Sequence, residues 1–161
     1  MAAAIALVQM LTEDNGQQIV CCANSGSQAR ILFDMCKDYS ESIDPNRLLF
    51  QRYRDSIKMP SKKSVIDVKN ADADTLDGLS CSSFILDELH AAKDYELYNV
   101  LKSSQGFQRQ PLAITITTAG NRLEVDSLLD IVMGLKKRNI AVVFISHKLD
   151  EVMRIDRKSV V

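Results

Sequence analysis

The stretch Phe84-Ile85-Leu86-Asp87-Glu88 is a short apolar run that ends in two consecutive carboxylates. A short apolar run bounded by polar residues is typical of a buried β-strand. In open α/β folds, ligands bind at the edge of the sheet where the strands have their carboxyl ends. The stretch therefore predicts a central strand that delivers Asp87 and Glu88 to a ligand-binding edge. The alternative is a strand end whose two acids are merely solvated.

The same layout is that of a Walker B element, in which two adjacent acids serve a nucleoside triphosphate. Asp87 is the predicted magnesium ligand because Mg²⁺ prefers oxygen donors, and Glu88 is the predicted catalytic acid that polarises the attacking water. A second strand is predicted over residues 112–117, and small hydroxyl residues and a glycine stand at its end, Thr117-Thr118-Ala119-Gly120. We expect the two strand ends to lie side by side, with Thr117 or Thr118 sensing phosphate.

Apolar strands alternate with helices outward from this stretch. Strands are predicted over residues 17–23, 84–86, 112–117 and 140–145, and shorter ones over residues 48–53, 57–59 and 64–68. Helices are predicted over residues 2–11, from an N-cap at Ser25 through residue 36, over 94–104 and 123–137, and from 148 to 155. Continuous apolar strands interleaved with helices predict a three-layer, mostly parallel α/β sheet covered on both faces.

The composition describes one ordinary globular domain. The chain has 161 residues, 46% of them hydrophobic, and a formal net charge of −1. These values exclude a disordered or collagen-like chain and any overall attraction to nucleic acid or anionic lipid. No apolar run approaches the roughly 20 residues that a membrane helix needs. The cysteines lack metal-site spacing and are predicted to be free thiols, a redox role for the adjacent Cys21 and Cys22 being the alternative.

Several ordered segments give the chain a resemblance to a known family. They are Ser27-Gln28-Ala29-Arg30, residues 71–79, residues 85–91 (ILDELHA) and residues 116–120 (ITTAG). With these segments, residues 2–120 resemble the ATPase domain of the large terminase subunit of tailed bacteriophages.

The resemblance implies a P-loop-type ATPase that drives viral DNA into a procapsid in the host bacterial cytoplasm, without membrane insertion. It implies Mg²⁺ and ATP as cofactors, and double-stranded DNA, the portal protein and the small terminase subunit as partners. Asp87 would hold the metal and Glu88 would be catalytic. Thr117, Thr118 and Gly120 would belong to the motif that senses the nucleotide and couples hydrolysis to DNA movement.

One element of the family is absent from the sequence. A phosphate-binding Walker A loop needs Gly-Lys-Ser/Thr, because its backbone N–H groups and its lysine hold the phosphates. None of the six glycines is followed by lysine. In the family this loop directly precedes a helix like residues 2–11, so we expect a sheet truncated before its first strand and Walker A loop, with the nuclease domain also missing. The chain alone is expected to bind ATP weakly and to hydrolyse it negligibly.

A different resemblance follows after residue 120. Residues 123–155 resemble the end of a sugar-type ATP-binding-cassette ATPase, in which His147 matches the histidine that contacts the γ-phosphate. An imidazole at a strand end can donate a hydrogen bond to a phosphate oxygen, and an ordinary surface histidine is the alternative. We therefore predict a terminase-like part over 1–120, a cassette-like segment over 121–155 and a non-native tail over 156–161, as in a composite of two reading frames.

Other functions remain open alternatives. The ATP-binding subunit of a sugar transporter would need a Leu-Ser-Gly-Gly-like signature, which the sequence lacks. A catalytically dead α/β domain would serve only as an interaction surface. A basic segment between Arg47 and Lys63 holds six basic residues against one acid, and it predicts either a contact with DNA phosphates or a solvated rim.

Overall fold

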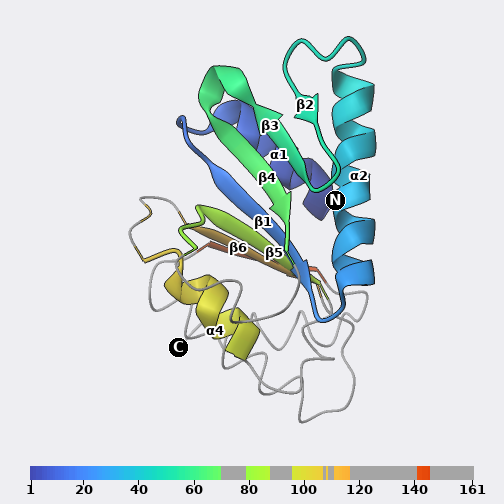
Figure 1. The fold of residues 1–161 in the computed structure, drawn as a ribbon. Helices are drawn as coiled ribbons and strands as arrows, with labels where there is room; N and C mark the ends of the chain where they lie inside the picture. The colour runs from blue at the N-terminus through green and yellow to red at the C-terminus, as the bar shows by residue number, and fades with distance from the viewer. Residues whose placement is uncertain (70–78, 88–95, 107, 109–110, 117–140, 146–161) are drawn as a thin grey trace.

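The computed structural model describes residues 1–69, 79–87, 96–106, 108 and 111–116, together with the backbone of 141–145 (Figure 1). Within these ranges, no helix is long and apolar enough to cross a membrane. The elements are, in chain order, α1 (Ala2–Thr12), β1 (Gln18–Ala23), α2 (Gly26–Ile43), β2 (Gln51–Arg52), β3 (Ser56–Met59), the 3₁₀ turn η1 (Pro60–Lys62), β4 (Ser64–Val68), β5 (Ser83–Asp87), α4 (Glu96–Ser103), β6 (Leu112–Ile116) and β7 (Ala141–Ile145).

The strands form one sheet in the order β2-β3-β4-β1-β5-β6-β7. Strands β4, β1, β5, β6 and β7 run parallel to one another, whereas β2 and β3 add an antiparallel edge next to β4. The chain runs from β1 to β4 on one side and then crosses to β5 on the other side of β1. The strand order therefore reverses at β1, and such a switch point is where open α/β sheets bind their ligands.

Helices cover both faces of the sheet, with α1 and α2 on one side and α4 on the other (Figure 1). Successive side chains of a strand point to opposite faces, and β1 supplies both cores. Ile19 and Cys21 pack with α1 and α2, whereas Val20 and Cys22 pack with α4. The predicted three-layer, mostly parallel α/β architecture is confirmed.

Helix α2 begins where the sequence predicts. Ser25 is its N-cap and accepts a hydrogen bond from the backbone N–H of Gln28 at 3.3 Å, which satisfies one of the N–H groups that have no partner inside the helix. The helix extends to Ile43, well beyond the predicted end at residue 36. The extension buries Ser40.

The loop after α2 corrects the prediction of a strand over residues 48–53. Only Gln51–Arg52 pairs as a strand. The carboxylate of Asp44 accepts hydrogen bonds from the backbone N–H groups of Leu48, Leu49 and Phe50, each at 2.8 Å. Because these N–H groups bind a side chain, they are not used in a strand ladder.

Asp44 makes the stability of the chain depend on pH. Burial favours the neutral carboxyl group, but the backbone N–H donors of Phe50, Leu49 and Leu48 outweigh it and lower the pKa of Asp44. Because its pKa is lower in the folded chain, the ionised Asp44 stabilises the fold at pH values above its pKa in the unfolded chain, about 3.9. This stabilisation is lost as the pH falls through the pKa of Asp44 in the folded chain. We expect Asp44→Asn to lower the thermal midpoint at pH 7, and the difference from the parent chain to shrink as the pH falls below about 3.9. Melting curves followed by circular dichroism between pH 3 and 7 measure this. An unchanged midpoint at pH 7 would contradict the assigned role.

The other described elements follow the predictions closely. The observed elements match the predicted helices and strands to within two residues at each end. These predictions are helices 2–11 and 94–104 and strands 17–23, 57–59, 64–68, 84–86, 112–117 and 140–145. The predicted helices over 123–137 and from 148 to 155 lie outside the described residues.

Candidate functional site

The carboxyl ends of the parallel strands meet at one edge of the sheet, and Asp87 lies in the middle of that edge. Asp87 pairs with Ala23 of β1 on one side and with Ile116 of β6 on the other, and Ile145 of β7 continues the row. We call this row the carboxyl edge. The strand that leads to Asp87 is buried, since its apolar residues 84–86 are at most 1% exposed, whereas Asp87 itself is only partly buried. A strand that carries a carboxylate to a central edge is the predicted geometry.

The N-terminus of α2 lies at the same edge, because the helix starts three residues after Ala23. Helix N-termini carry unpaired N–H groups and a partial positive charge, which favour anions. The edge therefore combines a carboxylate, which favours a cation, with a helix end that favours an anion. A divalent metal bound to phosphate has both charges.

The donor set at this edge fits Mg²⁺ in a nucleotide complex. Among the described residues, no three His, Cys, Asp or Glu side chains come together as a metal site. Mg²⁺ in nucleotide sites is held by only one or two protein carboxylates and completes its octahedron with waters and phosphate oxygens. Asp87 supplies one such carboxylate at this edge.

The remaining predicted site residues lie outside the described part of the chain. These are Glu88, Thr117, Thr118, Gly120 and His147. In sequence, Glu88 and Thr117 directly follow Asp87 and Ile116, which pair with each other across β5 and β6. The register therefore brings the last described residues of β5 and β6 to the same point of the edge.

The four cysteines are free and buried thiols. Burial raises the pKa of Cys22 to about 12 and also raises that of Cys81. A hydrogen bond with Cys36, together with burial, raises the pKa of Cys21 well above its ordinary value. Since the thiolate is the reactive form, the structure favours the core interpretation of Cys21 and Cys22 over a redox role.

Two members of the basic segment have structural roles that the sequence did not predict. Lys62 donates to the carbonyl oxygens of Leu11 and Glu13 at 2.6 and 2.8 Å, at the C-terminus of α1. The guanidinium of Arg52 donates to the carbonyls of Ser40 and Asp44 at 3.1 Å, at the C-terminus of α2. Cations stabilise the negative end of a helix, so these two side chains hold the helices to the sheet.

Arg30, the last residue of the segment Ser27-Gln28-Ala29-Arg30, contacts the basic segment. It forms an ion pair with Asp55 and donates to the carbonyl oxygen of Arg54 at 2.6 Å. The Arg30 guanidinium holds the pKa of Asp55 below its usual value. The contact joins α2 to the turn between β2 and β3, and it does not reach the carboxyl edge through any described contact.

Comparison with known proteins identifies relatives of this fold. The chain is similar to the crystal structure of the HK97 bacteriophage large terminase, with a TM-score of 0.72 and 22% identity over 91% of this chain and 32% of that one. It is also similar to the large terminase ATPase domain of Thermus phage P74-26, with a TM-score of 0.61 and 23% identity over 80% of this chain and 58% of that one. A large terminase from another thermophilic bacteriophage, in complex with ADP, matches with a TM-score of 0.66 and 13% identity over 99% of this chain and 40% of that one.

These relatives show the fold, and the chain spans between about a third and three fifths of their length. No curated protein matches the sequence. A family model described as the terminase large subunit, ATPase domain, matches residues 1–138. The match continues past the boundary predicted at residue 120, and the predicted resemblance of residues 123–155 to a cassette ATPase receives no support. With most of its length matched by this model, the chain belongs to the family of terminase large subunit ATPase domains.

Proposed function

We propose that the chain is part of an ATP-driven motor that packages viral double-stranded DNA, and that its nucleotide site is the carboxyl edge. The observation that carries the proposal is the place of Asp87, at the end of a buried central strand and beside the N-terminus of α2. Membership of the terminase ATPase family supports a nucleotide as the ligand, and one of the thermophilic-phage relatives is described in complex with ADP.

Each predicted residue has one role in this proposal. Asp87 holds Mg²⁺ through its carboxylate, either directly or through a bound water. Glu88 accepts a hydrogen bond from the water that attacks the terminal phosphate and orients it. Thr117, Thr118 and Gly120 follow the neighbouring strand β6 and sense the phosphate. The metal, when bound, neutralises charge that develops on the phosphate oxygens.

The portal protein and the small terminase subunit are the proposed protein partners, and the host bacterial cytoplasm is the proposed place of action. Both follow from the family resemblance. The sugar-transporter alternative has no observation in its favour. A catalytically dead interaction domain would predict that no nucleotide binds at the carboxyl edge.

The 161-residue chain is expected to bind ATP weakly and to hydrolyse it negligibly, because its sequence holds no Gly-Lys-Ser/Thr loop to cradle the phosphates. Calorimetric titration with ATP, in Mg²⁺ and again in excess EDTA, measures the binding. We expect weak binding that requires the metal. A phosphate-release assay measures turnover, which we expect at the level of a blank without protein. Magnesium-dependent turnover that disappears in Glu88→Gln would contradict the expected inactivity, and the absence of any nucleotide binding would favour the interaction-domain alternative.

A further inference from the structure

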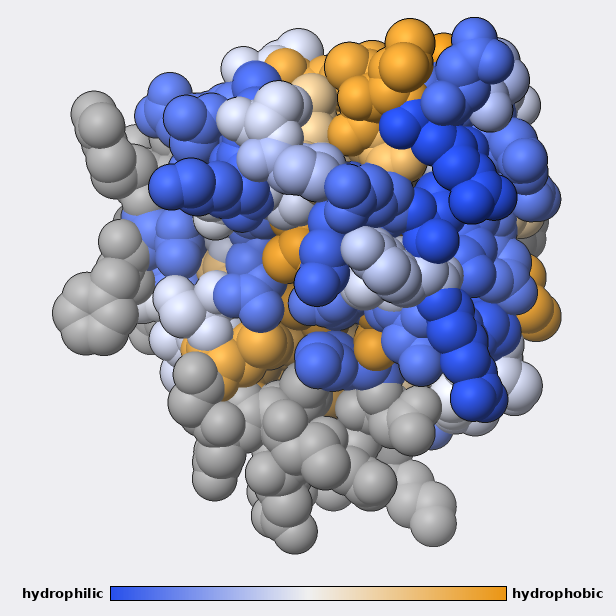
Figure 2. Space-filling view, turned by 45° about the horizontal axis from the view of Figure 1, so that its top comes forward, coloured by the Kyte–Doolittle hydropathy of each residue, from blue (hydrophilic) through white to orange (hydrophobic). Residues whose placement is uncertain are grey.

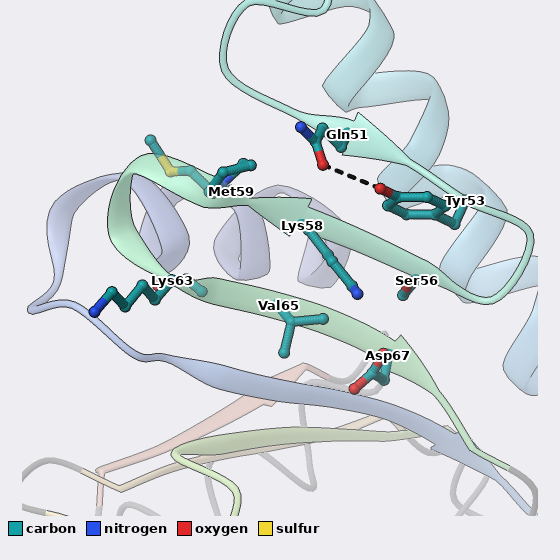
Figure 3. A pocket seen from close by; sticks show the side chains of 10 residues that line it. Gln51, Tyr53, Ser56, Lys58, Met59, Lys63, Val65 and Asp67 are labelled. Carbon is teal, nitrogen blue, oxygen red and sulfur yellow. Dashed lines mark hydrogen bonds between the residues drawn. The ribbon is translucent and has the colours of Figure 1, made fainter.

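A pocket lies away from the carboxyl edge, on the face of β2, β3 and β4 opposite α1 and α2 (Figure 3). It is an open pocket of about 640 Å³. Strand pairing builds it, because Lys58 pairs with Gln51 on one side and with Val65 on the other, and Ser56 pairs with Asp67. We call this surface the β2–β4 face; its lining residues are Gln51, Tyr53, Ser56, Lys58, Met59, Pro60, Lys63, Ser64, Val65 and Asp67.

The β2–β4 face is polar because the strands alternate. Ile57 and Ile66 point into the core with α1 and α2 and are fully buried. Their alternate neighbours on the two strands, Ser56, Lys58, Val65 and Asp67, therefore point the other way. Within the described chain, α4 is the helix on that side, and it packs on β1, β5 and β6. In the view of Figure 2, the described surface is mostly hydrophilic, with hydrophobic patches between the hydrophilic residues.

Two lysines of the basic segment line this pocket, and both are exposed. The ammonium of Lys58 lies 5.3 Å from the centre of the Tyr53 ring, a cation–π contact that holds it over the sheet face. The Tyr53 hydroxyl donates to the amide oxygen of Gln51 at 3.0 Å. Unlike Arg52 and Lys62, neither Lys58 nor Lys63 is engaged in a described contact with a helix end. Lys58 extends over the pocket, whereas Lys63 lies at its rim and its ammonium points outward (Figure 3).

Asp67 is the one carboxylate among the lining residues. It is partly buried, and burial raises its pKa against the opposing effect of Lys69 and Lys58. A single acid flanked by lysines does not make a cation site. The balance of charge therefore favours an anion, and removing the charge of Asp67 should strengthen the binding of that anion.

We propose that the β2–β4 face binds the phosphate backbone of duplex DNA, with Lys58 and Lys63 each pairing with a phosphate. The proposal rests on the packaging function proposed above, and it gives that function a DNA-contacting surface separate from the nucleotide site. The hydroxyl of Ser56, which also lines the pocket, is a further hydrogen-bond donor for phosphate oxygens. Contacts of this kind carry no base information, so binding is independent of sequence, as a packaging motor requires.

The test is fluorescence anisotropy of a labelled duplex of about 30 base pairs with the full 161-residue chain, over a series of salt concentrations. We expect the double variant K58Q/K63Q to bind about tenfold more weakly at low salt and to lose about 2 from the slope of log K against log salt. Asp67→Asn is expected to bind about threefold more tightly because one repulsive charge is gone. The double variant R47Q/R54Q removes two charges from the same basic segment but outside the pocket, and it is the matched control. Circular dichroism checks that each variant is folded.

The outcomes separate this inference from the function on which it rests. If the parent chain binds duplex and K58Q/K63Q behaves like R47Q/R54Q, the β2–β4 face is not the contact, although the DNA-packaging proposal stands. If the parent chain binds no duplex even at low salt, the DNA role of this chain fails and the inference fails with it. Weaker binding by the lysine variant together with tighter binding by Asp67→Asn supports both.

Discussion

Replacing Asp87 by asparagine is expected to weaken magnesium-dependent nucleotide binding by at least about tenfold. Removing a residue that only supports a metal ligand already lowers metal affinity by about 10- to 100-fold, so tenfold is a lower bound for a ligand itself. The substitution keeps the size of the side chain and removes its charge. An amide oxygen is a much poorer partner for Mg²⁺ than a carboxylate, because the cation is hard and carries two charges. Binding measured in EDTA should be the same for the parent chain and the variant.

The control for this prediction is Asp38→Asn, which removes an exposed carboxylate from α2. It lowers the net negative charge of the chain by the same amount but leaves the carboxyl edge intact. Titrations with ATP and Mg²⁺ compare the three proteins. Equal affinities for Asp87→Asn and Asp38→Asn would show that Asp87 does not hold the metal.

Truncation of Phe84 to alanine is expected to cost about 3–5 kcal/mol of the free energy of unfolding. Phe84 is fully buried, and its ring meets that of Tyr98 edge to face, with the ring centres 6.0 Å apart and the planes at 79°. The variant loses the buried apolar surface, leaves a cavity between β5 and α4, and loses the favourable ring contact. Because Phe84 stands on the strand that carries Asp87, the variant also loosens the support of the carboxyl edge.

Urea unfolding followed by circular dichroism measures this cost. Tyr39→Ala is the matched control, since it also removes an aromatic ring but from a position on α2 that is 42% exposed. We expect it to change the free energy of unfolding by less than about 1 kcal/mol. If the two substitutions cost the same, α4 does not pack on Phe84 as described.

The sequence predicts the central strands well, because their signal is local. Residues 84–86 and 140–145 are continuous apolar runs, so they indicate strands without any knowledge of which face is buried. Ser25 marks the start of α2 because its own side chain accepts the capping hydrogen bond. Helix α2 is harder to predict in detail. Its apolar residues fall on two faces, so Leu32 and Phe33 are buried while Ile31 is 61% exposed.

Features that depend on one particular side-chain contact are not predictable in this way, even where the two residues are close in sequence. A strand over 48–53 is a reasonable expectation from its apolar and aromatic residues, but the Asp44 carboxylate takes the N–H groups of that segment. The same holds for the basic segment. Its residues look alike in sequence, and only the register of β3 with β2 and β4 shows that Lys58 faces the pocket. The contact of Lys62 with the end of α1 likewise joins residues far apart in the sequence.

Metal-directed cleavage with Fe²⁺ in place of Mg²⁺ is the most direct test of the carboxyl edge as the nucleotide site. With ATP, ascorbate and peroxide present, bound iron produces radicals that cut the backbone nearby, and mass spectrometry locates the cuts. We expect cuts near Asp87 and at the junction of β1 and α2, because Ala23 pairs with Asp87 at this edge, and we expect Asp87→Asn to abolish them. Nucleotide-dependent cuts that fall only on the β2–β4 face, or that persist unchanged in Asp87→Asn, would contradict this account.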